Sequence, residues 1–324
     1  MNLIVCTLFE GHYHLGLIAL TNSLHSQGFR GAIYAGYRGS LPDWADKATP
    51  CENVWAGGRC YEVADGVQIY FLPLTTTYDL TNYKPDFMLN LLEIESINAQ
   101  GAFYFDPDIV VSAPWSFFTE WIGCGIALCE DVNSPLPSNH PRRVAWRNYF
   151  GDNGLNLKFK DCIYVNGGFI GVQKADFEFL HIWKEVQEKM ALKIGGLDRS
   201  IFSKIPMSEE TSGPFAPFGK TDQDALNAAV EAWDGNVSFV GQEGMAFKPG
   251  VPQMTHALGT PKPWHINHIT YALAGRPPRR VDRDYWQAMS GPIKYYSNSR
   301  ISIKKTSLLV AAFIGRFYKR FHLY

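Results

Sequence analysis

Two aspartates stand where a buried strand is expected to end. The run "GAFYFDPDIVV", residues 101–111, is apolar and aromatic up to Asp106 and becomes apolar again after Asp108, with Pro107 between them. In extended backbone, residues two apart face the same side, and proline stiffens the chain around it. The two carboxylates could then bind one divalent cation, since hard cations prefer oxygen ligands. A polar turn between two strands is the alternative, and the motif alone leaves both open.

Two other motifs place polar residues at positions that suit ligand contacts. In "YVNGGFIGV", Asn166 and Gly167 interrupt an apolar run. This indicates either close approach of a ligand to the backbone or a hairpin turn, and the Asn-Gly pair by itself favours the turn. In "TDQDALN", Asp222 and Gln223 open an expected helix. Carboxylates at that position are also favoured by the helix dipole, so capping competes with a role in chemistry.

A fourth motif, "THALGTPKPWH", combines His256, Gly259 and Lys262 on an expected loop. Imidazole is a common metal ligand, and an ammonium group is suited to phosphate. Glycine would let the backbone come close to such a ligand. A solvated loop histidine is the alternative.

The elements expected around these motifs form an α/β fold. An apolar run over residues 1–9, an amphipathic stretch over 12–29 and a second apolar run over 30–37 predict a parallel strand-helix-strand unit. Ligands of such open sheets bind at the carboxyl ends of the strands, where Asp106 and Asp108 are expected. Further strands are predicted over 67–74, 125–131 and 162–172, and further helices over 84–100, 176–193 and 221–233.

Composition bounds the class of protein. The chain has 324 residues, 46% of them hydrophobic, and a net charge of -1, which gives no reason to expect nucleic acid as a partner. None of the six cysteines forms a C-x-x-C pair, which favours free thiols in a reducing cytoplasm. We find no signal-peptide pattern and no apolar run long enough for a membrane span.

Taken together and in order, the four motifs resemble those of the retaining glycosyltransferases of family 8. The similarity covers residues 3–268 and is closest to bacterial galactosyl- and glucosyltransferases that build lipopolysaccharide outer cores. It implies a GT-A fold, with a central, mostly parallel mixed sheet flanked by helices, over a catalytic domain of residues 1–284. It also implies transfer of a hexose, from UDP-galactose or UDP-glucose, to a hydroxyl of a lipid-linked or surface glycan.

By this resemblance, Asp106, Asp108 and His256 would bind one Mn2+ or Mg2+ at the donor diphosphate. The imidazole ligand favours Mn2+. Lys262 would contact the β-phosphate, and Gly259 would let the backbone approach it.

The resemblance also assigns contacts with the donor sugar. Asp222 and Gln223 would lie beside the anomeric carbon, with Gln223 as a stabiliser of the oxocarbenium-like state rather than a nucleophile, because an amide is a weak nucleophile. The acceptor hydroxyl would then attack from the front face with retention of configuration. The other residues implied in binding the nucleotide sugar are Lys84, Asp106, Asp131, Asn166 and Gly167.

The N-terminal motif departs from the family pattern. Where the family has an acidic pair and an asparagine before its tyrosine, this chain has "CTLFEGHYHLG". Thr7 and Tyr13 are still expected to hold the nucleotide, Tyr13 by stacking on the base. The missing acidic residue leaves the identity of the base open.

The tail, residues 285–324, has no Asp or Glu after Tyr285 and combines basic residues with aromatic ones. This favours an anchor on an anionic membrane surface, and hence a peripheral location on the cytoplasmic face of the cell membrane. Packing of the tail on the catalytic domain is the alternative.

Two other functions are compatible with such a sheet. One is a catalytically silent module that binds a sugar nucleotide within a polysaccharide-assembly complex. The other is a nucleotidyltransferase, which would carry a glycine-rich basic phosphate loop after the first strand, and "CTLFEGHYHLG" matches that poorly.

Overall fold

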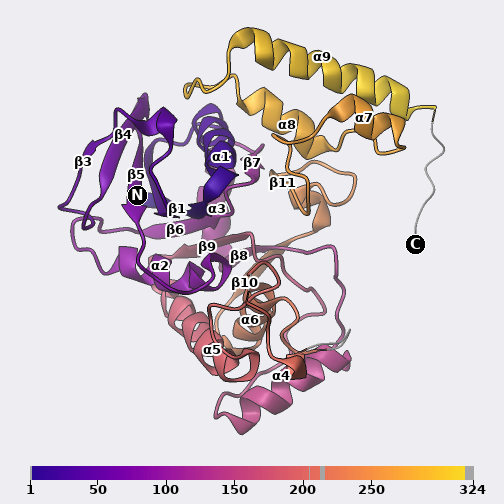
Figure 1. The fold of residues 1–324 in the computed structure, drawn as a ribbon. Helices are drawn as coiled ribbons and strands as arrows, with labels where there is room; N and C mark the ends of the chain where they lie inside the picture. The colour runs from indigo at the N-terminus through magenta and orange to yellow at the C-terminus, as the bar shows by residue number, and fades with distance from the viewer. Residues whose placement is uncertain (1, 204, 212–215, 318–324) are drawn as a thin grey trace.

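A central sheet of nine strands organises the computed structural model, which describes residues 2–203, 205–211 and 216–317 (Figure 1). The strand order is β10-β8-β9-β6-β1-β2-β5-β4-β3, and the neighbours among β6, β1, β2 and β5 are parallel. Strand β9 is antiparallel to both β6 and β8. The strands are β1 (Leu3–Glu10), β2 (Gly31–Arg38), β3 (Thr49–Pro50), β4 (Arg59–Ala64), β5 (Val67–Pro73), β6 (Gly101–Phe105), β8 (Ile126–Cys129), β9 (Phe169–Gln173) and β10 (Val237–Val240).

Helices cover both faces of this sheet. Alternate residues of β1 belong to two separate cores: Val5 and Phe9 pack with α1, and Cys6 and Leu8 pack with α2. The predicted α/β class, with a mixed central sheet flanked by helices, is therefore confirmed. The helices are α1 (His14–Ser26), α2 (Lys84–Leu92), α3 (Trp115–Trp121), α4 (Pro141–Asp152), α5 (Glu178–Ile194), α6 (Thr221–Ala232), α7 (His268–Leu273), α8 (Arg280–Ala288) and α9 (Asn298–Gly315).

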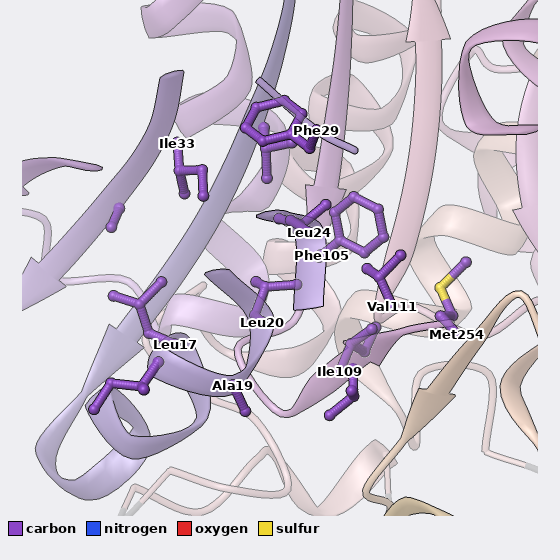
Figure 2. Packing of buried hydrophobic residues seen from close by; sticks show 14 of the residues in the cluster. Leu17, Ala19, Leu20, Leu24, Phe29, Ile33, Phe105, Ile109, Val111 and Met254 are labelled. Atoms are coloured by element: carbon purple, nitrogen blue, oxygen red, sulfur yellow. The ribbon is translucent and has the colours of Figure 1, made fainter. Parts of the chain in front are cut away.

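Helix α1 packs through the apolar stripe that its sequence predicts. Leu17, Leu20 and Leu24 recur at helical spacing, are fully buried, and belong to the same core as Phe105 at the end of β6 (Figure 2). The helix ends before Gly28, whose φ of +89° lies in the left-handed region that glycine adopts without strain. This packing fixes α1 beneath the strand end that carries the two aspartates.

A second, two-stranded sheet joins distant parts of the chain. Strand β7 (Ile109–Val111) follows the aspartates and pairs antiparallel with β11 (Met254–His256). Residues Ile109 and His256 are opposite each other in this pair, and the amide of Ala257 donates to the carbonyl of Asp108 at 3.1 Å. The pairing therefore brings a histidine next to an aspartate that lies far from it in sequence.

The expected strand over 162–172 differs from the structure. Only Phe169–Gln173 is a strand, and the preceding residues form a loop linked to Glu130 by one isolated bridge at Val165. Asn166 and Gly167 do not form the turn of a hairpin. They belong to this loop, and the strand β9 that follows it pairs with β6 and β8. The expected helix over 84–100 is shorter and ends at Leu92.

The C-terminal region packs on the domain through helix α9, which lies along α7 and α8 (Figure 1). Ile301, Leu308 and Ala311 are buried. Residue 285, the expected start of the tail, lies inside α8, where Tyr285 is buried. The last residues of the predicted tail, 318–324, lie outside the described residues.

We predict that Gly16→Ala disturbs the site from beneath. A Cβ at Gly16 of α1 would lie 2.3 Å from the carbonyl oxygen of Pro107, so the helix or the Asp-Pro-Asp segment must move. We expect a loss of about 1–3 kcal/mol in unfolding free energy, as in other overpacked interiors. Chemical denaturation measures it.

The matched control is Gly151→Ala in helix α4, where no atom lies within 4 Å of the added Cβ. This change should be neutral or stabilise the protein by up to about 1 kcal/mol, since alanine is the better helix former. Equal stability of Gly16→Ala and the wild type would contradict the close packing of α1 on Pro107.

Candidate functional site

The two aspartates lie at the mouth of a cavity of about 610 Å³ at the carboxyl ends of the central strands. The amide of Ile109 donates to the carbonyl of Asp106 at 3.1 Å, so residues 106–109 form a turn rather than continued extended backbone. Asp106, Pro107 and Asp108 all line the cavity. The polar turn that the sequence offered as an alternative is therefore present, and it still presents both carboxylates to one site.

His256 completes a group of three possible metal ligands. Asp106, Asp108 and His256 each offer one atom, and these atoms lie within 4.8 Å of one another. The Nε2 atom of His256 is 3.3 Å from Oδ1 of Asp108 and 3.8 Å from Oδ2 of Asp106. Neighbouring ligands around an octahedral cation with bonds of about 2.1 Å are about 3 Å apart, so the group is close to that geometry.

The orientation of the imidazole also fits a metal ligand. Nδ1 of His256 is 3.1 Å from Oδ1 of Asn166, an amide oxygen that can only accept a hydrogen bond. The neutral ring therefore carries its proton on Nδ1 and turns the lone pair of Nε2 toward the two carboxylates. Three electron-rich atoms facing one another repel unless a cation lies between them, so this donor set fits a divalent metal ion.

Asn166 is itself held in place. Its Nδ2 donates to Oδ2 of Asp131 at 2.7 Å, and its Oδ1 also accepts from the amide of Gly168 at 2.9 Å. Asp131 in turn accepts from the amide of Asn133 at 2.9 Å. Asp131 and Asn166 therefore form a chain of hydrogen bonds that orients the imidazole of His256.

Gly168 leaves room for this arrangement. A Cβ at this position would lie 2.6 Å from Cε1 of His256 and 2.9 Å from Oδ2 of Asp106. The position belongs to the Asn-Gly-Gly motif, but sequence reasoning selected its neighbour Gly167. The backbone of Gly168 therefore approaches two of the three candidate metal ligands closely, and contact of this motif with a bound sugar stays a prediction.

Lys262 forms an ion pair with one of the metal-ligand candidates. Its Nζ donates to Oδ2 of Asp108 at 2.6 Å and to the carbonyl of Ala257 at 2.7 Å. Burial would raise the pKa of the Asp108 carboxyl, but a protonated imidazole at His256, as opposed to the neutral metal-binding form, and the ammonium of Lys262 outweigh burial and hold that pKa well below its usual range. Asp108 is therefore ionised in the site.

Lys84 joins the metal group to the start of helix α6. Its Nζ lies 3.1 Å from Oδ1 of Asp106 and 3.1 Å from Oδ2 of Asp222, and donates to the carbonyl of Gly167 at 2.7 Å. Burial would lower the pKa of this ammonium group, but the two carboxylates outweigh burial and raise the pKa above its usual value. A buried charged lysine thus offsets part of the negative charge of two carboxylates.

Gln223 presents an amide that the protein satisfies only in part. Its Oε1 accepts from the amide of Gly167 at 3.2 Å, whereas Nε2 is buried and has no hydrogen-bond partner. Both Asp222 and Gln223 line the cavity. Such a donor beside a cavity is satisfied by water or by a bound ligand, which makes Nε2 of Gln223 a candidate ligand contact.

Of the two residues predicted to hold the nucleotide, only one lines the cavity. Tyr13 lines the cavity, and the ammonium of Lys262 lies 5.5 Å from the centre of its ring. Thr7 is fully buried within β1 and does not line the cavity. Glu10 does line it and pairs with Arg38 at 2.9 Å, which is an interaction that the sequence did not suggest.

The structure thus brings together in one cavity every predicted site residue except Thr7. These residues are Tyr13, Lys84, Asp106, Asp108, Asp131, Asn166, Gly167, Asp222, Gln223, His256, Gly259 and Lys262.

Two supporting residues escaped the sequence analysis. Tyr104 donates from its hydroxyl to Oδ1 of Asp106 at 3.0 Å. It lies two residues before Asp106, so the two-residue period of a strand could have predicted the contact. Asp224 accepts from the Tyr164 hydroxyl at 2.7 Å and the Lys220 amide at 2.8 Å, and burial raises its pKa to about 7. These bonds fix the start of α6.

Comparisons with known proteins find solved structures of limited similarity and assign no family. No protein-family model matches the chain, and no curated protein matches it. Among solved structures, the chain is similar to the glycosyltransferase GlyE of Streptococcus pneumoniae TIGR4, with a TM-score of 0.48 and 13% identity over 95% of this chain. It is also similar to the bifunctional glycosyltransferase WbbM, with a TM-score of 0.44 and 12% identity over 94% of this chain. The alignments span 64% and 52% of those two chains.

We predict that Lys262→Met tightens metal binding to the donor-free protein. Lys262 is bonded to Oδ2 of Asp108, the carboxylate whose Oδ1 faces His256, so the ammonium group and a cation compete for the negative charge of one carboxylate. Removing the lysine should strengthen Mn2+ binding on the order of ten-fold, the size of a charge-assisted contact. Isothermal titration of the protein with MnCl2, in the absence of nucleotide sugar, measures the affinity.

Lys305→Met is the matched control for net charge, because Lys305 is a half-buried residue of α9 that donates to Ser290, outside the metal group. It should leave Mn2+ affinity unchanged. Weaker or equal Mn2+ binding by Lys262→Met would show that the lysine does not compete with the metal.

Proposed function

We propose that this protein is a metal-dependent retaining glycosyltransferase. It would move a hexose from a nucleoside-diphosphate sugar, with UDP-galactose or UDP-glucose as the proposed donors, to a hydroxyl of a glycan or glycolipid. The observation that carries the proposal is one cavity that contains an Asp-Asp-His group, a lysine paired with it, and a partly unsatisfied Gln223. The proposed GT-A fold and family 8 membership rest on the four motifs and their order.

The charge of the cavity suits a diphosphate donor. A bound divalent cation, with Mn2+ preferred because one ligand is an imidazole, would neutralise charge that develops on the leaving nucleoside diphosphate. Lys262 is placed to exchange Asp108 for a phosphate oxygen. Gly259 has a φ of +70° and no atom within 4 Å of a would-be Cβ, so its backbone can approach a phosphate closely.

The other end of the cavity suits the donor sugar. Asp222, held by Lys84 at 3.1 Å, would place negative charge beside the anomeric carbon and stabilise an oxocarbenium-like state. The free Nε2 of Gln223 would donate to the sugar or its leaving oxygen. Because an amide is a weak nucleophile, we propose front-face attack by the acceptor hydroxyl, with retention of configuration.

A silent sugar-nucleotide-binding module is the second candidate function. Such a module would need the same lysines and the same Asp-Asp-His group to bind the nucleotide sugar. It would not need a carboxylate and an amide beside the sugar. The presence of both Asp222 and Gln223 in the cavity favours the enzyme.

We also propose that residues 1–284 carry catalysis and residues 285–324 associate with an anionic membrane at its cytoplasmic face. The division is functional, since it runs through α8. Within the described chain, no helix is long and apolar enough to cross a bilayer. At about 100° per residue, the exposed apolar side chains of α9 lie opposite its buried ones, with basic residues on both flanks. The exposed ones are Ile303, Leu309, Val310 and Phe313.

We predict that Asp108→Asn and His256→Ala each lower release of UDP from UDP-galactose or UDP-glucose by at least about 100-fold. Loss of a residue that only hydrogen-bonds to a metal ligand already lowers activity by up to that factor, and these variants remove a ligand itself. The assay uses EDTA-treated enzyme supplied with Mn2+. His265→Ala, a histidine outside the metal group, is the control and should keep most of the activity. Full activity of either variant would rule out the proposed centre.

For the membrane proposal, we predict that Leu309→Ser with Phe313→Ser releases the full-length chain from vesicles. Each side chain is more than half exposed, at 72% and 57%, so folding should be unaffected. Co-sedimentation with vesicles of phosphatidylcholine and phosphatidylglycerol should fall several-fold. Val251→Ser, at another exposed apolar residue, is the control. Equal sedimentation of the double variant and the wild type would contradict the proposal.

A further inference from the structure

We propose that the turn of residues 200–203 is an acceptor platform, on which Phe202 stacks against a sugar ring of the acceptor. The inference rests on the proposed function, because it assigns a role to the open side of the same cavity. It names the acceptor as a glycan that presents the flat C–H face of a pyranose beside the reacting hydroxyl.

The platform consists of apolar side chains at the rim of the cavity. Ile201 and Phe202 both line it, although 51% and 72% of their surfaces are exposed. Val132, next to Asp131, is a third lining residue and is 49% exposed. Single exposed apolar residues are common on proteins, but three that line one cavity indicate a surface that a ligand covers.

The backbone holds these side chains in place. The buried side chain of Asn82 donates to the carbonyls of Leu197 and Arg199, both at 2.9 Å. Within the turn, Oγ of Ser200 accepts from the amides of Phe202 at 3.0 Å and Ser203 at 3.1 Å. Because the turn is bonded to the cavity wall and to itself, the exposure of Phe202 follows from the fold.

The position fits the acceptor rather than the donor. The diphosphate would lie by the metal group, Lys262 and Gly259, and the donor hexose would lie between Lys84 and Gln223. The platform lines the same cavity as Lys220, which stands two residues before Asp222. The segment before the platform is bonded to Asn82, and Lys84, two residues further on, is paired with Asp222. An acceptor that reaches the anomeric carbon past Asp222 would therefore pass close to Phe202.

The chemistry of the rim favours a sugar over an alkyl chain. A pyranose has an apolar face and a polar edge, and an aromatic ring beside charged side chains matches both. At this rim, Phe202 offers the aromatic face, while Lys220 and Asp222 offer hydrogen-bonding groups. A lipid chain would gain from the apolar surface but would cover the charged groups without satisfying them.

The test compares acceptor stimulation of UDP release for Phe202→Leu, Phe202→Ala, Phe202→Tyr and the wild type. The probes are methyl β-glucoside, methyl β-galactoside and methyl β-lactoside, together with octyl β-lactoside, and each is assayed with Mn2+ and UDP-galactose or UDP-glucose. The donor-only hydrolysis rate is measured in parallel, because no acceptor takes part in it. Phe159→Leu, at an exposed phenylalanine that does not line the cavity, is the matched control.

We expect Phe202→Leu and Phe202→Ala to raise the acceptor KM roughly ten-fold with the donor-only rate unchanged, and Phe202→Tyr and Phe159→Leu to behave as the wild type. The methyl and octyl lactosides should be affected equally. The inference is overturned if Phe202→Leu matches the wild type, if only the octyl lactoside responds, or if no methyl glycoside stimulates a wild type that hydrolyses the donor. Absence of donor turnover in the wild type would instead count against the proposed function.

Discussion

The site depends on the pairing of β7 with β11. The turn after β6 can present Asp106 and Asp108, but their negative charge needs groups that local sequence does not supply. Because Ile109 pairs with His256 and Asp108 accepts from the amide of Ala257, the imidazole and Lys262 reach the same carboxylate. Without this two-stranded sheet, Asp108 would be a buried carboxylate with no partner, which is costly.

Buried charge in the cavity is balanced in pairs. Lys262 is bonded to Asp108, and Lys84 is bonded to both Asp106 and Asp222, so three carboxylates lie near two ammonium groups. Such pairs gain little in net stability, because removing both charges from water costs about as much as their attraction returns. Their value for the proposed function is that Lys262 would exchange a carboxylate for a phosphate oxygen without leaving the cavity. The negative excess that remains suits a divalent cation.

Sequence reasoning succeeded where local rules decide the structure and failed where long-range packing does. The position of Asp106 and Asp108 follows from strand periodicity and a carboxyl strand end, and the apolar stripe of α1 follows from helical spacing. His256 joins them through a strand pairing over about 150 residues, which only the order of motifs suggested. The Asn-Gly pair at 166 and 167 is a local hairpin signal and by itself favours a turn. Tertiary contacts with His256 and Gln223 determine the loop instead. Phe202 gave no signal, since an exposed phenylalanine has no characteristic spacing.

Glycines explain how so many polar groups fit into one site. Gly16 lets α1 touch the carbonyl of Pro107, and Gly168 lets β9 begin within van der Waals distance of His256 and Asp106. Each contact comes from a different element, so the carboxylates are confined from beneath by α1 and from the side by β9. A cation site needs its ligand atoms fixed to within a few tenths of an ångström, and side chains at either glycine would hold the elements further apart than that. Glycine at positions 16 and 168 is therefore required for the site, as are the carboxylates and the imidazole.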